Sequence, residues 1–307
     1  MHHGLIIDTF LHGPWIGGDI PGGRADRVDW LGDRRLRRVM RTFDHVNDRQ
    51  EKTDHMTMPE VLAALDRSGV GRGILAAKVY YVARPEAVLD LNRHFAALCA
   101  QVPDRFKWIA SVIPPELGAS SYWDVMQNTR MLDALAGLPG LCGIHITPSP
   151  WGILPNDRWF YPVYAKCVEL GLPVFTYVGA PGPLWPMLPN DPALLDDVAL
   201  AFPELKIIAH HIGDPWTEIS VRMAARHENF YICTSAWSPK AYPEPLMRFL
   251  RGKWHGVRGC DKVVFASDYP LMDLDRTVRD ARAMDLAQDQ LAAFLSGTAE
   301  RLFWGTP

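Results

Sequence analysis

The stretch GLIIDTFLH, Gly4–His12, decides the fold, because it is an apolar run that ends in a carboxylate and an imidazole. A second apolar run, Leu205–His211, ends in two histidines, and a third, Lys262–Asp268, ends in an aspartate. Such runs are typical of buried parallel strands. Parallel α/β folds place their chemistry at the carboxyl ends of the strands. The sequence therefore predicts one site that is built from the ends of separate strands.

Strand-like runs alternate with helical patterns along the chain, and each predicted strand is followed by a helix. The strands are expected at Gly4–His12, Gly71–Tyr80, Phe106–Ile113, Leu141–Thr147, Pro173–Gly179, Lys206–His211, Phe230–Trp237 and Val263–Ser267. This alternation predicts an α/β fold of the (β/α)8 TIM-barrel type. A doubly wound open sheet is the alternative, but no glycine-rich phosphate loop follows any of these strands.

A long polar and glycine-rich stretch, about residues 13–56, separates the first strand from the first predicted helix, Glu60–Ser68. Structureless loops of this length are uncommon in compact domains and are usually functional. We therefore expect one barrel domain over residues 1–307, with this insertion folded over the site or onto a partner subunit. His45 or His55 is expected to approach the pocket.

The overall composition excludes several classes of protein. A net charge of −3 is not the basic footprint that nucleic-acid binding requires. No apolar run approaches the length of a membrane span, and no signal-peptide pattern opens the sequence. The five cysteines lack short paired spacings, which suits buried thiols in a reducing compartment. We expect a cytoplasmic protein that acts on a small molecule, with neither a nucleic-acid nor a membrane partner.

Three strand-end residues form the candidate metal site. His12, His211 and Asp268 belong to different strands, and together they are the open three-ligand set of a catalytic divalent ion. Asp8 shares a strand face with His12 by the alternation of side chains, so it would support or ligate the ion. Zinc, iron or manganese would suit this mixture of imidazole and carboxylate.

The same residues have structural alternatives. A single histidine at a strand end is more often a hydrogen-bonded structural residue than a ligand, and Asp268 could cap the turn that follows it. Because adjacent strand residues face opposite sides, only one of His210 and His211 is expected to face the barrel interior, and His210 is expected to face away.

Substrate contacts are predicted from the ends of other strands. Lys78, after the second strand, would orient a carboxylate, and a solvated lysine is the equal alternative. Tyr177 and His145 belong to the fifth and fourth strands. Trp216 is one of several tryptophans after strands, which indicates an apolar mouth or a partner surface. A homodimer or a hetero-oligomer is expected for the same reason.

Five blocks of sequence carry a resemblance that extends over nearly the whole chain. They are Gly171–Val174, Phe202–Ile207, His211–Trp216, Lys262–Pro270 and the closing Ser296–Phe303. Together these blocks resemble the amidohydrolase-2 branch of the amidohydrolase superfamily. That branch includes aminocarboxymuconate-semialdehyde decarboxylase and related aromatic-acid decarboxylases.

The resemblance implies a metal-dependent barrel with one divalent ion. Its ligands would be a His-x-His pair on the first strand, a histidine on the fifth and an aspartate on the eighth, with a sixth-strand histidine nearby. In this sequence the second histidine of the pair is His12, the sixth-strand histidine is His211, and the aspartate is Asp268.

The sequence departs from the implied ligand set at two positions. Phe10 stands in place of the first histidine of the pair, and Tyr177 stands in place of the fifth-strand histidine. Loss of two nitrogen donors should weaken zinc binding and displace the ion. Asp8 and His145 are the available substitutes, and Tyr177 could ligate as a phenolate.

Two activities follow from the resemblance. In hydrolysis of a small amide, Asp268 would accept a proton from metal-bound water while His211 steadies the oxyanion. In non-oxidative decarboxylation of a small carboxylic acid, the metal would hold the substrate and the same pair would handle the proton. The alternative is a subunit of a metal-dependent monooxygenase (hydroxylase), paired with a related barrel subunit, or a metal-free pseudoenzyme partner. The changes at Phe10 and Tyr177 would suit such a partner.

Overall fold

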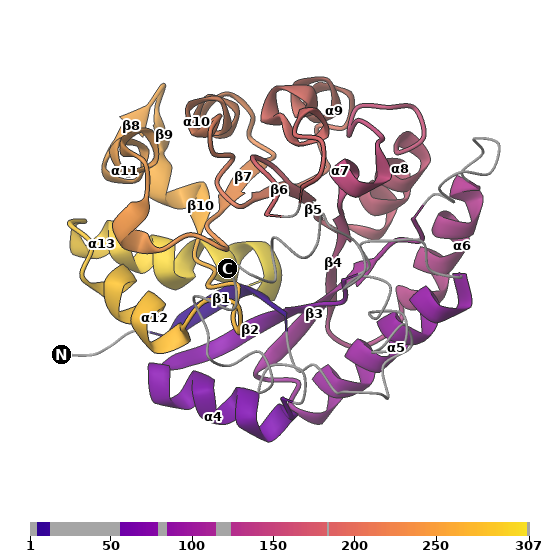
Figure 1. Cartoon of the computed structure of the whole chain (residues 1–307), viewed down its shortest axis with the longest axis horizontal. Helices are drawn as coiled ribbons and strands as arrows, with labels where there is room; N and C mark the ends of the chain where they lie inside the picture. The colour runs from indigo at the N-terminus through magenta and orange to yellow at the C-terminus, as the bar shows by residue number, and fades with distance from the viewer. Residues whose placement is uncertain (1–4, 13–55, 79–84, 115–123, 183, 306–307) are drawn as a thin grey trace.

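Eight parallel strands, paired in the order of the chain, form the wall of a barrel (Figure 1). They are β1 (Ile6–Leu11), β2 (Val70–Ala76), β3 (Phe106–Ser111), β4 (Leu141–Ile146), β5 (Val174–Tyr177), β6 (Ile207–His210), β7 (Phe230–Cys233) and β10 (Val263–Val264). The predicted TIM-barrel fold is confirmed. This computed structural model describes residues 5–12, 56–78, 85–114, 124–182 and 184–305.

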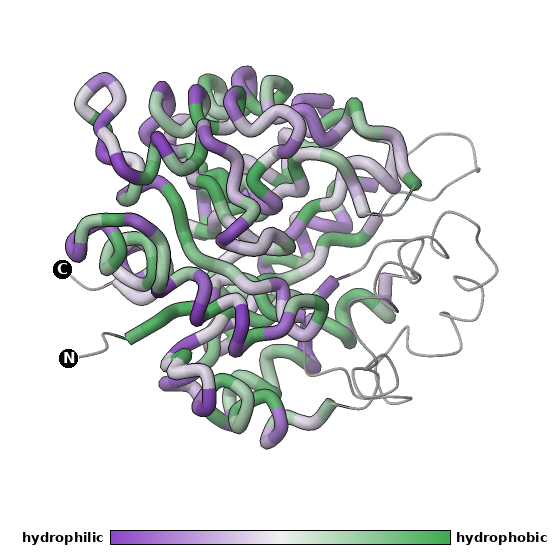
Figure 2. Tube along the Cα trace, turned by 60° about the vertical axis from the view of Figure 1, so that its left-hand side comes forward, coloured by the Kyte–Doolittle hydropathy of each residue, from purple (hydrophilic) through white to green (hydrophobic). Residues whose placement is uncertain are grey.

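Helices cover the outside of the wall (Figure 1). They are α4 (Met58–Ser68), α5 (Pro85–Gln101), α6 (Val125–Leu135), α7 (Pro148–Trp151), α8 (Tyr161–Leu170), α9 (Leu195–Ala201), α10 (Thr217–Arg226), α11 (Glu244–Arg251), α12 (Leu274–Arg282) and α13 (Gln288–Ala292). The α4 helix begins at Met58, two residues before the expected Glu60, and the Thr57 amide donates to Glu60 Oε2 at 2.7 Å across its first turn. Hydrophobic and hydrophilic residues alternate along the outer helices in Figure 2, as expected for helices with one buried face.

Several short elements join these helices and strands. A two-stranded antiparallel hairpin, β8 (Lys253–Trp254) and β9 (Val257–Arg258), lies between α11 and β10. The last helix continues from α13 through two π-helical segments, η5 (Ala293–Gly297) and η6 (Glu300–Trp304). Short 3-10 turns are η1 (Leu188–Asn190), η2 (Pro192–Leu194), η3 (Pro239–Ala241) and η4 (Gly259–Asp261).

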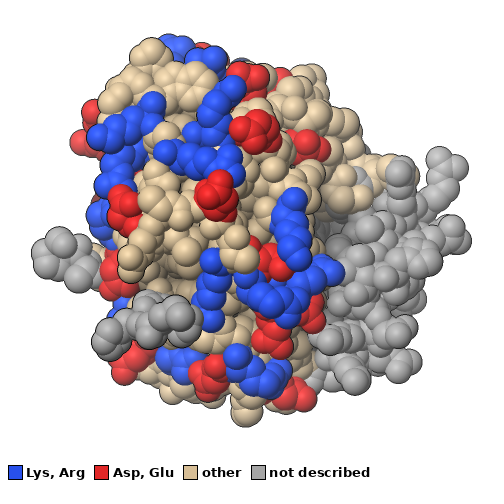
Figure 3. Space-filling model, turned by 90° about the vertical axis from the view of Figure 1, so that its left-hand side faces the viewer, with Lys and Arg blue, Asp and Glu red and all other residues tan. Residues whose placement is uncertain are grey.

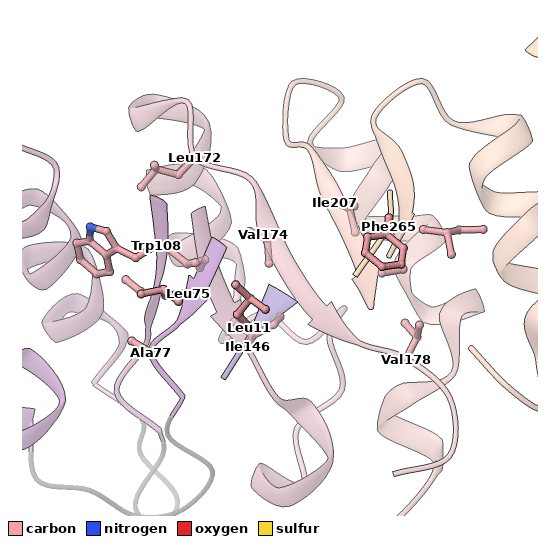
Figure 4. Packing of buried hydrophobic residues seen from close by; sticks show 14 of the residues in the cluster. Leu11, Leu75, Ala77, Trp108, Ile146, Leu172, Val174, Val178, Ile207 and Phe265 are labelled. Carbon is pink, nitrogen blue, oxygen red and sulfur yellow. The ribbon is translucent and has the colours of Figure 1, made fainter. Parts of the chain in front are cut away.

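The strands are apolar on both faces, as expected for a parallel sheet that is covered by helices. Outward-facing side chains such as Leu75, Trp108 and Val174 pack in the layer between sheet and helices (Figure 4). Inward-facing side chains such as Ile74, Ile109 and Ile208 form a separate cluster in the barrel interior. Trp108 belongs to the outer cluster and its neighbour Ile109 to the inner one, because adjacent residues of a strand face opposite sides.

Backbone hydrogen bonds close the barrel between its first and last strands. The Thr9 amide donates to Phe265 O at 3.0 Å, and the Asp268 amide donates to Phe10 O at 3.1 Å. The His12 amide donates to Tyr269 O at 2.8 Å. These bonds bring the residues that follow β10 beside the end of β1.

The carboxy-terminal helix closes the amino end of the barrel. Phe303 stacks on Phe175 of β5 with 5.6 Å between ring centroids, and both belong to the interior cluster. Arg72 of β2 donates to both carboxylate oxygens of Glu300, at 2.7 and 2.8 Å. The apolar interior is therefore sealed at this end, which leaves the carboxyl end for polar residues.

The structure leaves one part of the sequence-based prediction untested. The expected insertion, about residues 13–56, lies outside the described residues except for Met56, and His45 and His55 lie outside them too.

The predicted strands Lys206–His211 and Phe230–Trp237 end early, at His210 and Cys233. Left-handed backbone follows each of these strands, at His211 with φ 76° and at Ala236 with φ 64°.

Charges of both signs lie interspersed on the face of the molecule shown in Figure 3. Ion pairs join them, and Arg258 lies 2.8 Å from Asp289. Such a surface differs from the single-sign stripe of a nucleic-acid-binding protein. Across the described ranges, none of the helices combines the length and the apolar character that crossing a membrane demands.

Phe303→Ala tests the seal at the amino end of the barrel. The Phe303 ring is buried, so its loss should lower the free energy of unfolding by about 3–5 kcal/mol. Urea denaturation measures the change, and Leu200→Ala, at a side chain that is 58% exposed, is the control that should change little. Equal effects of the two substitutions would show that Phe303 does not seal the interior.

Candidate active site

A group of polar and aromatic side chains lies at the carboxyl end of the barrel, and we call it the mouth cluster. Its members are Phe10 of β1, His12 just after β1, Lys78 after β2, His145 of β4, Tyr177 of β5, His210 at the end of β6, His211 just after it, and Asp268 after β10. The four histidines and Asp268 are buried. TIM-barrel enzymes carry their active sites at this end.

His12 and Asp268 form a hydrogen-bonded pair across the closure of the barrel. The distance from His12 Nε2 to Asp268 Oδ1 is 2.8 Å. Burial disfavours the charged form of Asp268, but His12, His211 and Lys78 together hold the pKa of its carboxyl well below the usual range. Burial and the charge of Lys78 lower the pKa of His12. At neutral pH, a neutral His12 therefore donates its Nε2–H to an ionised Asp268.

His210 and His211 both lie in the mouth cluster, so the expectation that His210 faces away is wrong. β6 ends at His210, and His211 has a left-handed backbone with φ 76°, so the alternation of side chains stops there. Their ring centroids are 4.1 Å apart. The Nδ1–H of His211 donates to Ser235 O at 3.0 Å, which leaves Nε2 as the proton-accepting nitrogen. Burial lowers the pKa of His211 to about 4.

His145 and His210 form a second buried pair. Their Nε2 atoms are 2.9 Å apart, so one ring donates and the other accepts. Burial lowers the pKa of both imidazoles well below the usual value, and the charges of neighbouring histidines and Lys78 lower it further. Both rings are therefore neutral at pH 7, and the two Nε2 atoms share one proton.

Phe10 lies at the centre of the mouth cluster. Its ring stacks on His210 with 4.8 Å between centroids and meets the His12 ring edge-on at 5.6 Å. The Lys78 ammonium lies over the same ring, with Nζ 4.5 Å from its centroid. Burial lowers the pKa of Lys78 to about 8, although the charge of Asp268 opposes the change. Lys78 is thus positively charged at neutral pH and lies within the cluster.

Asp8 binds backbone amides beneath the mouth cluster. Its Oδ1 accepts from the Phe10 amide at 3.2 Å and from the Ser267 amide at 3.1 Å. Burial raises the pKa of Asp8 to about 7, although the hydrogen bonds from Ser267 and Phe10 act in the opposite direction. The carboxyl group joins β1 to the segment that carries Asp268, which makes it a support for the site.

Tyr177 lies in the mouth cluster, and Trp216 follows His211 by five residues in the sequence. The Tyr177 ring is 4.3 Å from the His211 ring between centroids, and its hydroxyl accepts from the Gly182 amide at 3.2 Å. Burial raises the pKa of Tyr177 well above its usual range, which disfavours a phenolate ligand. Trp216 is half-buried just before α10, and none of the ring contacts that join the cluster among described residues involves it.

The backbone at the mouth is strained at the residues that carry the polar groups. Asp268 has φ 63°, and His211 and Ile212 have φ 76° and 55°. Left-handed backbone outside glycine costs on the order of 1 kcal/mol per residue and is common at functional sites. The left-handed residues thus include His211 and Asp268, two members of the mouth cluster.

The described residues do not fit the divalent ion that the resemblance implies. Within the described ranges, no group of three or more His, Cys, Asp or Glu side chains is arranged to hold a metal ion. Phe10 offers no donor, and the pKa of Tyr177 favours the neutral phenol. A positive charge, that of Lys78, already lies at the Phe10 ring. Asp8 is engaged by backbone amides.

The fold and the strand-end site define a protein of the TIM-barrel class. The chain belongs to the Amidohydro_2 family, described as Amidohydrolase, whose sequence profile matches residues 43–304. A comparison with curated proteins gives no match.

Solved structures with the same fold include decarboxylases. An uncharacterized TIM-barrel protein from Bordetella bronchiseptica has a TM-score of 0.76 and 21% identity, with 97% of each chain covered. The 5-carboxyvanillate decarboxylase from Sphingomonas paucimobilis has a TM-score of 0.70 and 21% identity, covering 98% of this chain and 99% of its own. The 5-carboxyvanillate decarboxylase from Novosphingobium aromaticivorans was solved with manganese and 4-hydroxy-3-methoxy-5-nitrobenzoic acid. It has a TM-score of 0.72 and 20% identity, covering 98% of this chain and 96% of its own.

Asp8→Asn tests the support role of Asp8 through its pH dependence. The raised pKa means that the folded protein holds a proton that the unfolded chain releases, so the wild type loses stability as pH rises toward 7. The asparagine keeps the Oδ1 acceptor and does not titrate. Between about pH 5 and about pH 7, the wild type should lose roughly 2 kcal/mol of unfolding free energy relative to Asp8→Asn. Denaturation curves of both proteins at the two pH values measure this change. If the difference in unfolding free energy between wild type and Asp8→Asn were the same at both pH values, the assignment would be contradicted.

Proposed function

We propose that this chain is an enzyme that removes CO2 non-oxidatively from a small aromatic carboxylic acid. The observation that carries the proposal is the buried pair of His12 and Asp268, 2.8 Å apart, at the carboxyl end of the barrel. Decarboxylation requires one proton at the carbon that loses CO2, and an imidazole held by a carboxylate is suited to carry it. The likeness of the fold to decarboxylases supports this choice.

The proposed reaction exchanges a carboxylate for a proton. The C–C bond breaks, CO2 leaves, and the bonding electron pair forms a C–H bond with a proton from the His12 imidazolium. His12 takes up this proton when the anionic substrate enters, because a nearby negative charge raises the pKa of an imidazole. Asp268 stabilises the imidazolium, and solvent restores the proton after each turnover. His211, with Nε2 available as acceptor, is the second candidate carrier.

Decarboxylation suits the described residues better than hydrolysis does. Amide hydrolysis needs a strongly activated water, and the donor set in the described ranges does not fit an ion that would activate it. A carboxylate that is moved from water into a buried pocket is poised to lose CO2. The rings of Phe10, Tyr177 and His210 give the mouth cluster the aromatic character that suits an aromatic substrate.

A deuterium-incorporation assay tests the proposed reaction. Purified protein is incubated with 5-carboxyvanillate and other hydroxybenzoates in D2O, and the products are measured by mass spectrometry and NMR. We expect one deuterium at the ring carbon that lost CO2. Asp268→Asn and His12→Gln should each lower kcat/KM by about 10²–10⁴-fold.

A second histidine–carboxylate pair on the same chain provides the matched control. His227 Nε2 lies 2.6 Å from Asp196 Oδ1, outside the mouth cluster. His227→Gln should leave kcat/KM unchanged. Amide hydrolysis without CO2 release, or a full rate in Asp268→Asn, would contradict the proposed function.

A partner subunit of a metal-dependent monooxygenase is the second candidate. It is favoured by Phe10 and Tyr177, which cannot replace nitrogen ligands, and by exposed apolar side chains at one segment after β5. Leu184, Met187 and Leu188 are 43%, 40% and 62% exposed there. Such side chains favour a homodimer or a hetero-oligomer with a related barrel. Leu188→Glu would then change the oligomeric state in size-exclusion chromatography, and an unchanged monomer would count against this candidate.

A further inference from the structure

Tyr177 is a polar member of the mouth cluster that remains accessible from outside. It is half-buried, whereas the four histidines of the cluster and Asp268 are buried. The hydrogen bond from the Gly182 amide to the Tyr177 hydroxyl, 3.2 Å long, is exposed. A ligand at the carboxyl end of the barrel can therefore reach this hydroxyl.

The Tyr177 hydroxyl has an unused hydrogen-bond donor. A hydroxyl carries one O–H donor and two acceptor lone pairs. The Gly182 amide occupies one lone pair, because an amide N–H can only donate. Within the described ranges, no residue accepts a hydrogen bond from the Tyr177 O–H. A phenol keeps its proton at neutral pH, so the mouth cluster offers one neutral donor to an incoming oxygen atom.

The backbone after β5 fixes the position of this hydroxyl. The Ala180 amide donates to Asp214 O at 2.6 Å. A Cβ atom at Gly179 would meet the same carbonyl oxygen at 2.6 Å, so glycine permits this close approach. From this anchored segment the Gly182 amide returns to the Tyr177 hydroxyl. The donor is thus preorganised, which lowers the entropic cost of binding.

The neighbours of Tyr177 indicate which oxygen atom it meets. Its ring lies 4.3 Å from the His211 ring between centroids. His12 and His211 are the candidate proton carriers, and the proton goes to the carbon that bears the carboxylate. A donor beside a proton carrier is therefore close to the carboxylate of the bound acid. A hydrogen bond to a charged oxygen is also stronger than one to a neutral oxygen.

We propose that Tyr177 is a substrate-binding residue whose hydroxyl donates a hydrogen bond to the carboxylate of the aromatic acid. The inference rests on the proposed function for the identity of that acid. The bond exists in the bound substrate before CO2 leaves, so it contributes to binding and not to the chemical step. Tyr177 therefore determines the affinity for the acid, while His12, paired with Asp268, delivers the proton.

Calorimetry of Tyr177→Phe with benzoate and nitrobenzene tests the proposal without an activity assay. The two ligands have nearly the same shape, but nitrobenzene is neutral and a weak acceptor. Tyr177→Phe should raise the benzoate Kd about ten- to a hundredfold and leave the nitrobenzene Kd within about twofold. A general change of the site would weaken both ligands. Tyr161→Phe, at a half-buried tyrosine of α8, is the matched control and should bind both as the wild type does.

A stronger donor at the same position keeps the test decisive if Tyr177→Phe does not fold. The amino acid 3-fluorotyrosine, introduced at residue 177, has nearly the size of tyrosine and a more acidic hydroxyl. At mildly acidic pH, where this phenol is still protonated, the variant should bind benzoate a few-fold more tightly than the wild type. A tyrosine with a merely structural role would gain no affinity from the fluorine.

Steady-state kinetics with 5-carboxyvanillate separates binding from chemistry. Tyr177→Phe should raise KM about ten- to a hundredfold, with kcat within a few-fold of the wild type. The reason is that the hydrogen bond is present in both the bound substrate and the transition state, so its loss weakens both equally.

Three results would overturn the inference: an unchanged benzoate Kd in Tyr177→Phe, equal losses for benzoate and nitrobenzene, or no gain with 3-fluorotyrosine. These results are separable from the proposed function. Tyr177-dependent benzoate binding in a protein that releases no CO2 would remove the decarboxylase assignment and leave the carboxylate site. Release of CO2 with an unchanged KM in Tyr177→Phe would leave the assignment and remove the role of Tyr177.

Discussion

The closure of the barrel between β1 and β10 is the constraint on which the site depends. One carboxylate oxygen of Asp8 accepts the amides of both Phe10 and Ser267, and the Asp268 amide donates to Phe10 O. These bonds hold the end of the first strand against the segment after the last one. The pair of His12 and Asp268 is the side-chain consequence, because its two members are 256 residues apart in sequence and 2.8 Å apart in space.

The barrel interior is apolar at its amino end and carries buried polar side chains at its carboxyl end. At the amino end, Phe303 and Phe175 seal an apolar cluster. At the carboxyl end, the same low-polarity surroundings contain imidazoles, one carboxylate and one ammonium. Burial keeps the imidazoles neutral, so Asp268 and Lys78 hold the fixed charges of the mouth cluster. Charges in such buried surroundings interact strongly, since few solvent molecules screen them.

The sequence predicted the barrel and the convergence of its strand ends, because apolar runs and their terminal polar residues are local signals. The meeting of His12 with Asp268 follows from the topology once the barrel is recognised. The position of His210 was not predictable from alternation, since the left-handed backbone of His211 ends the strand rule. Sequence likewise identified Phe10 only as a lost ligand, whereas its contacts with Lys78 and His210 depend on three-dimensional packing.

A crystal structure of the protein grown with manganese and benzoate, with anomalous diffraction at the manganese edge, tests the central claim most directly. The account predicts no anomalous peak in the mouth cluster, because the described donors there do not fit a divalent ion. His12 and Asp268 should remain hydrogen-bonded to each other. An anomalous peak ligated by His12 and Asp268, with the benzoate carboxylate on the metal, would contradict it.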